Sequence, residues 1–217
     1  ALAYITFYCL IQFHLLLKYN KGRNEESVSK EGLSYSGESL PLITIQLPVF
    51  NERFVVERLI DNIVTMDYPA DKLEIQVLDD STDDTTEVCK RKVDEYKGKG
   101  IDIVYIHRTN REGFKAGALR DGLKVAKGEF IAIFDADFLP HKDFLLKTVP
   151  YFKDTQVGVV QTRWEHINGD YSLITRLQAF QLNVHFSIEQ YGRQAGNYLL
   201  QFNGTAGVWR RHTILDA

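Results

Sequence analysis

Two aspartates separated by one residue, Asp135 and Asp137, follow a short and wholly apolar run at Phe130–Phe134. In extended backbone the side chains of residues i and i+2 point to the same side, so we expect the two carboxylates to face one point. A hard divalent cation suits such oxygen ligands and is commonly shared with the phosphates of a substrate. The spacing therefore predicts a site for Mg²⁺ or Mn²⁺ at Asp135 and Asp137.

Three further segments combine charged or polar groups after apolar runs. They are Pro48–Glu52, the pair Asp79 and Asp80, and Asn110–Gly117 with its Lys115. Neighbouring residues of a strand point to opposite sides, so we expect one aspartate of the pair to face a ligand and the other to hold the backbone. Lys115 stands at the start of an expected helix, where an ammonium group and a helix N-terminus can meet a phosphate together.

The elements that must position these residues alternate between strand and helix patterns. Apolar runs predict strands at 42–47, 73–78, 101–107, 130–134 and 157–161, and helical spacing of apolar residues predicts helices at 55–64, 82–97, 116–127, 144–151 and 171–190. We expect Asn51 to cap the first helix and Gly128 to close the third. This alternation predicts an α/β fold, a mostly parallel sheet with helices on both faces.

Ligands of such sheets bind beyond the carboxyl ends of the strands, where the four polar segments are expected. Asp and Asn are also common at strand ends because they cap helices and close turns, and this explanation stays open for any one segment. Four segments at the same edge favour a binding site.

Composition limits the possible classes of protein. The chain has 217 residues, of which 44% are hydrophobic, and a formal net charge of −3. A nucleic-acid-binding protein should show a basic excess, so no nucleic-acid partner is expected. Cys9 and Cys89 lie far apart in unlike contexts, which predicts no disulfide and a reducing compartment.

The N-terminal segment Ala1–Leu17 is apolar and is followed by Lys18, Lys21 and Arg23. It lacks the basic start and small-residue cleavage site of a signal peptide. A buried core helix is an alternative, but we favour a transmembrane helix cut at its N-terminus. The basic residues after it place a linker at 18–40 and a domain at 41–217 on the cytoplasmic side of the cell membrane.

Six motifs occur in an order that resembles a known family. They are Pro48–Glu52, Val77–Asp83, Lys115–Leu119, Phe134–Phe138, Val160–Trp164 and Phe202–Arg210. In this order and at these intervals they resemble the inverting, processive family-2 glycosyltransferases, and most of all the cellulose-synthase-like mannan and glucan synthases. The resemblance covers residues 41–211 and implies a GT-A-like fold.

The resemblance assigns roles on the nucleoside side of a donor site. Phe50 and Glu52 would line the nucleoside pocket. Asp80 would contact the base or ribose, and Asp79 would support it. Lys115 would contact the diphosphate.

The resemblance also assigns the metal and acceptor sides. Asp135 would lie near the ribose and the metal, and Asp137 would bind the metal directly. The segment Phe202–Arg211 would form a loop that borders the acceptor. The implied reaction is transfer of a hexose, with inversion, from a nucleoside diphosphate sugar to a growing β-glycan at a membrane. UDP-glucose is slightly favoured over GDP-mannose as the donor, and the acceptor is a polysaccharide.

The sequence departs from the family pattern in two motifs. Such enzymes carry a Thr-Glu-Asp-like segment whose Asp is the general base, and a Gln-x-x-Arg-Trp that holds the growing chain. Neither is found, and Gln161–Trp164 has one residue too few between its Gln and Arg. We therefore expect no catalytic base within the chain and place the base beyond Ala217.

Three other functions are compatible with parts of this pattern. Haloacid-dehalogenase phosphohydrolases also place Asp-x-Asp after an apolar strand, but after the first strand and before Thr or Val, whereas Phe138 follows here after three earlier strand and helix units. A non-catalytic nucleotide-binding scaffold stays open. A Rossmann dehydrogenase is disfavoured because no Gly-x-Gly-x-x-Gly follows the first strand.

Overall fold

The computed structural model describes residues 2–25 and 40–216. The chain forms two compact units. The first, called the helical unit here, comprises Ala1–Leu33 and Arg163–Phe202; the second, called the sheet unit, comprises Ser34–Thr162 and Asn203–Ala217. Most of the linker predicted at 18–40 lies outside the described residues, and so does Ala1.

The sheet unit is built on six strands in the order β3-β2-β1-β4-β6-β5. Their bounds are β1 Ile43–Val49, β2 Leu73–Asp79, β3 Ile103–His107, β4 Phe130–Ile133, β5 Val159–Gln161 and β6 Gly207–Arg210. The first four are parallel, and β6 runs antiparallel to both β4 and β5. The predicted mostly parallel sheet is confirmed. The predicted acceptor loop is wrong in part, since its second half forms β6.

The two central strands are buried over almost their whole length, so β-branched and aliphatic residues dominate them. Ile43, Ile45 and Leu47 of β1 are fully buried. One face of these strands carries polar residues that pair across the parallel register. Thr44 Oγ1 donates to Glu74 at 2.6 Å, and the amide nitrogen of Gln46 donates to the oxygen of its neighbour on β2 at 3.0 Å. The groups paired in this way cost little free energy, whereas the amide nitrogen of Gln76 has no hydrogen-bond partner among the described residues.

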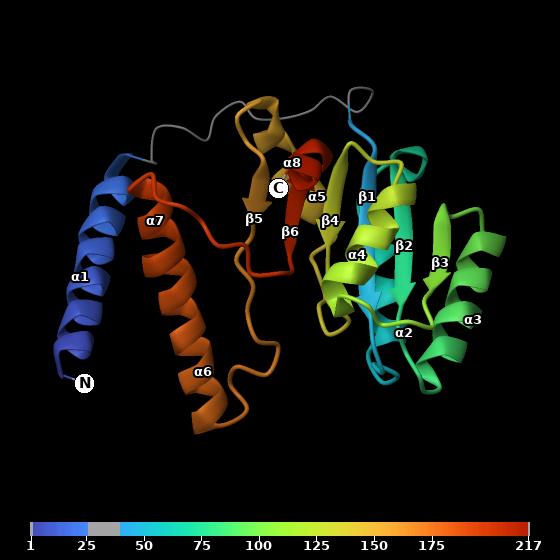
Figure 1. The fold of residues 1–217 in the computed structure, drawn as a ribbon, viewed down its shortest axis with the longest axis horizontal. Coiled ribbons are helices and arrows are strands. Elements are labelled where there is room, and N and C mark those ends of the chain that lie inside the picture. The colour runs from blue at the N-terminus through green and yellow to red at the C-terminus, as the bar shows by residue number, and fades with distance from the viewer. Residues whose placement is uncertain (1, 26–39, 217) are drawn as a thin grey trace. The chain divides into compact units, whose positions relative to one another are not determined.

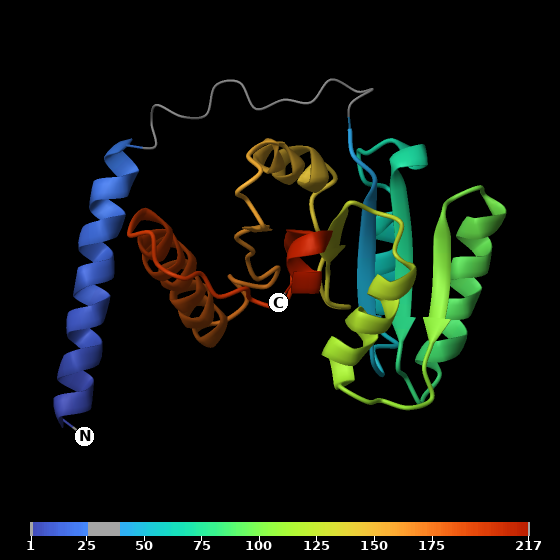
Figure 2. The ribbon, with the colours of Figure 1, turned by 45° about the horizontal axis from the view of Figure 1, so that its top comes forward.

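Helices cover both faces of the sheet, as predicted. Their bounds are α2 Val56–Ile63, η3 Ala70–Lys72, α3 Thr85–Gly98, α4 Phe114–Val125, α5 Phe144–Thr148, η4 Val149–Lys153 and α8 Arg211–Asp216. Helix α4 crosses in front of β1 and β2, and α2 lies behind them (Figure 1). Figure 2 shows the same position for α4 from a second direction.

Two predicted helix ends are wrong. Helix α2 begins at Val56, and Asn51 lies well before it with a left-handed φ of 55°. Helix α4 ends at Val125, so Gly128 is not its cap. Gly128 is needed for another reason, because a Cβ there would lie 2.3 Å from the backbone nitrogen of Thr44.

The helical unit contains α1 Leu2–Glu25, α6 Leu173–Val184, the π-helical segment η5 His185–Gln190 and α7 Tyr191–Ala195. The helix predicted at 171–190 is present and continues to Ala195. Helix α1 packs against η5 and α7, and a Cβ on Gly192 would lie 2.6 Å from the carbonyl oxygen of Leu15. By length and composition, Leu2–Gly22 could cross a bilayer, with a mean hydropathy of 1.3.

Candidate functional site

The carboxyl ends of β1, β2 and β4 and the start of α4 enclose a cavity of about 360 Å³, within the range of small-molecule sites. It is lined by Pro48, Val49, Phe50, Glu52, Asp80, Arg111, Lys115, Ala118, Asp135, Ala136 and Asp137. The lining holds six of the seven residues predicted from the sequence. The seventh, Asp79, is absent from it, and Arg111 is present although it was not predicted.

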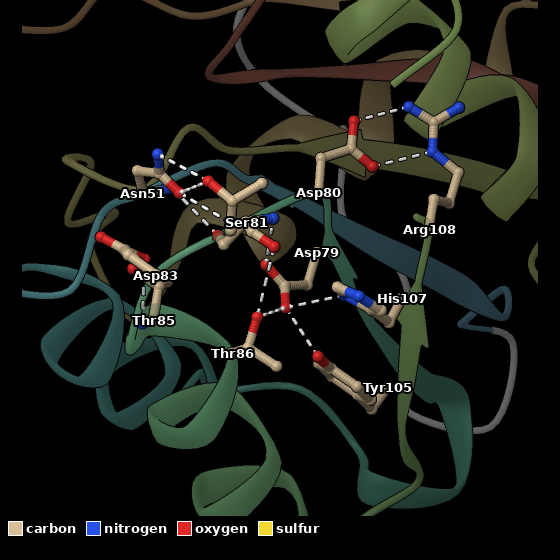
Figure 3. A network of polar contacts seen from close by, with 11 residues as sticks. Asn51, Asp79, Asp80, Ser81, Asp83, Thr85, Thr86, Tyr105, His107 and Arg108 are labelled. Atoms are coloured by element: carbon tan, nitrogen blue, oxygen red, sulfur yellow. Dashed lines mark hydrogen bonds and ion pairs between the residues drawn. The ribbon is translucent and has the colours of Figure 1, made fainter. Parts of the chain in front are cut away.

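Asp79 is the centre of a buried hydrogen-bond network (Figure 3). Its carboxylate accepts bonds from the backbone N–H of Ser81 at 2.9 Å, the Thr86 hydroxyl at 2.9 Å and the Tyr105 hydroxyl at 2.6 Å, and lies 3.2 Å from Nδ1 of His107. Burial raises the pKa of Asp79, but the bonds from Ser81, Tyr105 and Thr86 outweigh it, so the pKa lies below its ordinary value. Asp79 therefore holds the loop after β2 and does not face the cavity.

Asn51 joins the loops that follow β1 and β2. Its backbone N–H donates to the Ser81 hydroxyl at 2.9 Å, and its side-chain oxygen accepts from the N–H of Thr82 at 2.9 Å. Asn tolerates the left-handed backbone found here better than most residues. The bonds that Asn51 makes across the two loops fix the position of Phe50 and Glu52 beside Asp80.

Asp80 faces the cavity and is held by Arg108. The guanidinium donates to the two carboxylate oxygens at 2.8 Å and 2.5 Å, and the two side chains are only 4% and 8% exposed. This bidentate pair fixes the carboxylate in one orientation. Hydrogen bonds to Asp80 raise the pKa of Arg108 further above its ordinary value, so it stays charged. Sequence reasoning missed Arg108, although it stands directly after β3 as the predicted residues stand after their strands.

A second arginine that was not predicted, Arg111, packs on the ring of Phe50. The guanidinium carbon of Arg111 lies 3.1 Å from the centroid of the Phe50 ring, and both residues line the cavity. A planar cation over an aromatic face is a favourable contact. This wall of the cavity therefore presents a flat, cationic surface.

Lys115 opens α4, as expected, and reaches two partners across the cavity. Its ammonium forms an ion pair with Asp135 and donates to the carbonyl of Gly204 at 2.8 Å. The backbone N–H of Asp135 donates to the Thr205 hydroxyl at 3.0 Å. The segment before β6 thus supports both charged groups from the side opposite to α4.

Asp135 and Asp137 line the same cavity, but not through strand alternation. Strand β4 ends at Ile133, and a turn closed by the N–H of Phe138 and the carbonyl of Asp135 follows at 3.1 Å. The expectation of extended backbone is therefore wrong, although both carboxylates reach the cavity. Burial, and then the charges of Asp137 and Asp135, raise the pKa of Glu52.

These carboxylates fit a divalent cation of the predicted kind. Among residues 2–25 and 40–216 no cluster of three or more His, Cys, Asp or Glu could hold a metal by itself. Mg²⁺ and Mn²⁺ are commonly held by one or two carboxylates together with substrate phosphates, so Asp135 and Asp137 suffice in number. Besides burial, which is the larger cause, repulsion from Asp137 and Asp135 raises the pKa of Glu52, and this repulsion marks an excess of negative charge that a cation would relieve.

Known proteins resemble this chain over most of its length. Residues 44–216 match the family described as glycosyl transferase family 2. The chain is 45% identical over 184 residues to the probable glucomannan 4-beta-mannosyltransferase 11 of Oryza sativa subsp. japonica, covering 82% of this chain and 32% of the relative. It is 40% identical over 193 residues to the glucomannan 4-beta-mannosyltransferase 9 of Arabidopsis thaliana, covering 87% of this chain and 36% of the relative.

A solved structure resembles it as well. The mannosyltransferase PcManGT from Pyrobaculum calidifontis, in complex with GDP-Man and Mn²⁺, superposes with a TM-score of 0.69 at 27% identity over 95% of this chain and 55% of that one. The chain spans about a third of the length of the curated relatives it matches. The GT-A-like fold and the predicted family are confirmed, and the chain belongs to glycosyl transferase family 2.

Proposed function

We propose that this chain forms the donor-binding part of a metal-dependent mannosyltransferase that uses GDP-mannose and extends a β-glycan with inversion. The observation that carries the proposal is the single cavity that brings Phe50, Asp80, Lys115, Asp135 and Asp137 together at the carboxyl ends of the strands. It offers an aromatic wall, a fixed acceptor, a cation and two metal-type carboxylates. A nucleoside diphosphate sugar needs each of these groups.

The donor is the finer part of the proposal, and here GDP-mannose replaces the slight preference for UDP-glucose drawn from the sequence. The relatives above are named glucomannan mannosyltransferases, and the solved neighbour holds GDP-Man. The pair of Asp80 and Arg108 supports a guanine base. Every N–H of Arg108 is already donated within the protein, so the pair offers only carboxylate acceptors to a ligand. Guanine presents two neighbouring donors to such an edge, whereas uracil presents one donor between two carbonyls.

The diphosphate side is formed by Lys115 and the two metal-type carboxylates. Asp137 would hold the divalent cation, Mn²⁺ or Mg²⁺, with Asp135 beside it. When bound, that cation stabilises the negative charge that develops on the departing diphosphate. Lys115 adds a positive charge on the same side, provided that its ammonium moves from Asp135 to the phosphates.

Membrane attachment is part of the same proposal. Leu2–Gly22 is long and apolar enough to cross a bilayer, and Lys18, Lys21 and Arg23 lie at its C-terminal end. By the positive-inside rule these residues favour a cytoplasmic position for the sheet unit. An epitope inserted at Gly100, in a turn of the sheet unit, should resist external protease in intact cells and be cleaved after permeabilisation. Cleavage in intact cells would show that the sheet unit lies on the outer side of the membrane.

Calorimetry with the purified chain tests the donor assignment. GDP and GDP-mannose, each titrated with and without Mn²⁺, should bind more tightly than UDP and UDP-glucose, and Mn²⁺ should strengthen binding of both GDP ligands. Asp71→Asn serves as a control because Asp71 is exposed in η3 and outside the cavity. Tighter binding of UDP-glucose would show that GDP-mannose is not the donor. No binding of any nucleotide would refute the proposed function.

A further inference from the structure

The guanidinium of Arg108 is fully committed within the protein. Nε and Nη2 donate to Asp80, Nη2 also donates to the carbonyl of Phe114 at 3.0 Å, and Nη1 donates to the carbonyl of Glu112 at 3.2 Å and to Asp121 at 3.1 Å. A guanidinium has five N–H groups, and these contacts use all five. Arg108 is therefore placed to hold other groups and not to bind a ligand itself.

The groups that Arg108 holds lie on two sides of the cavity. Asp80 belongs to the side proposed for the nucleoside. The carbonyls of Glu112 and Phe114 belong to the turn that leads directly into Lys115, on the side proposed for the diphosphate. One buried side chain thus joins the two halves of the donor site.

The backbone of this turn needs support. Gly113 and Phe114 have left-handed φ angles of 69° and 49°. For Phe114 this conformation is unfavourable, and the residue is 65% exposed, so burial does little to hold it. The bond from Arg108 to the Phe114 carbonyl is part of what fixes the turn and, with it, the start of α4.

Gly117 gives independent evidence that the turn is fitted around Arg108. A Cβ at this position would lie 1.9 Å from the carbonyl oxygen of Glu112 and 2.8 Å from Nη1 of Arg108. The backbone of α4 therefore closes directly onto the guanidinium and its acceptor. Only glycine permits this approach.

We propose that Arg108 is a positioning residue that couples the two sides of the donor site, so that the nucleoside and the diphosphate bind cooperatively. The inference rests on the proposed function. Arg108 fixes the orientation of Asp80 and, through the turn at 112–114, the position of Lys115. A nucleoside that restrains Asp80 also restrains the turn, because the same planar guanidinium holds both groups.

Lysine at this position would keep the charge and lose the coupling. An ammonium carries three N–H groups on one atom, so it cannot reach both oxygens of Asp80 and the turn at the same time. Arg108→Lys is therefore the informative variant.

The test is a double-mutant cycle on the purified chain with saturating Mn²⁺. Calorimetry measures the affinity for GDP and for guanosine in the wild type, Arg108→Lys, Lys115→Met and the double variant. Lys115→Met should weaken the binding of GDP and leave the affinity for guanosine unchanged. Arg108→Lys should weaken the binding of both ligands. Lys115 contacts Asp135 and Gly204 and, within the described part of the chain, makes no direct bond to Arg108, yet we expect the two effects on GDP affinity to be non-additive by about fivefold or more.

Additive effects on GDP would overturn the coupling. If Arg108→Lys fails to unfold cooperatively on heating, Asp121→Ala takes its place in the cycle, since it removes one of the five acceptors. Lys124→Met is its matched control, because Lys124 is the other close partner of Asp121 at 2.6 Å, and it should change neither affinity. Absence of GDP binding in the wild type would refute the proposed function, whereas additivity with intact binding refutes only the coupling.

Discussion

The two acidic pairs that follow β2 and β4 are built in opposite ways. After β2, Asp79 and Asp80 are almost fully buried, and both carboxylates are occupied by hydroxyl, backbone and guanidinium donors. After β4, Asp137 is exposed, and Asp135 is held mainly by Lys115, which is itself 38% exposed. The nucleoside side is therefore organised before a ligand arrives, and the metal side keeps charge available for one.

This comparison predicts that Asp79 matters for folding. Asp79→Ala should lower the free energy of unfolding by about 3 kcal/mol, because it leaves buried donors of Ser81, Thr86 and Tyr105 without an acceptor. Chemical denaturation measures the change. Asp137→Ala is the matched variant and should stay close to the wild type in stability. Equal losses in both variants would remove the distinction.

Asp137 should matter for the metal instead. Asp137→Asn should abolish the strengthening of GDP binding by Mn²⁺, with a loss of about 100-fold or more where the metal is saturating, since even second-shell changes at metal sites cost about 10–100-fold. Calorimetry with and without Mn²⁺ measures it, and Asp71→Asn serves as the exposed control. An unchanged response to Mn²⁺ would show that Asp137 does not hold the metal.

Asp80 should act on the base without the metal. Asp80→Ala should weaken guanosine binding by about tenfold, the usual size for a lost hydrogen bond to a charged group, whether or not Mn²⁺ is present. Full affinity in this variant, with a stable fold, would take Asp80 out of the nucleoside pocket.

The smallest expected effect is on the pH dependence of stability. The pKa of Asp79 is lowered in the folded state, so its carboxylate stabilises the fold above the pKa of the unfolded chain, and this contribution is lost as the pH falls through the folded pKa. The midpoint temperature of thermal unfolding should therefore fall more steeply with decreasing pH in the wild type than in Asp79→Asn. Parallel curves would show that other carboxylates govern the acid response.

Most of the fold could be predicted because the first five strands are short apolar runs between helical patterns. Strand β6 was missed because Gly207–Arg210 has only two apolar residues and gains its strand conformation from pairing with β4 and β5. The prediction of Asn51 as a helix cap is wrong because its conformation also depends on contacts far away in the sequence. Its partners lie on the loop after β2, and no local pattern shows such a contact.

The candidate site was predicted where the residue type itself suggests chemistry. Asp135, Asp137 and Lys115 stand at strand ends or a helix start and reach the cavity. Neither Arg108 nor Arg111 carries such a signal, because an arginine is mostly exposed unless it is paired. Their importance comes from neighbours that only the folded chain brings near them, Asp80 for the first and Phe50 for the second.

The position of β6 has a consequence for the order of folding. Strands β1, β2 and β3 pair with one another early in the chain, so the nucleoside side can form from nearby segments. Strand β4, which carries the metal side, obtains its second neighbour only from β6, far along the chain. Pairing between distant segments is slow, so the nucleoside side should gain protection from hydrogen exchange before the metal side during refolding.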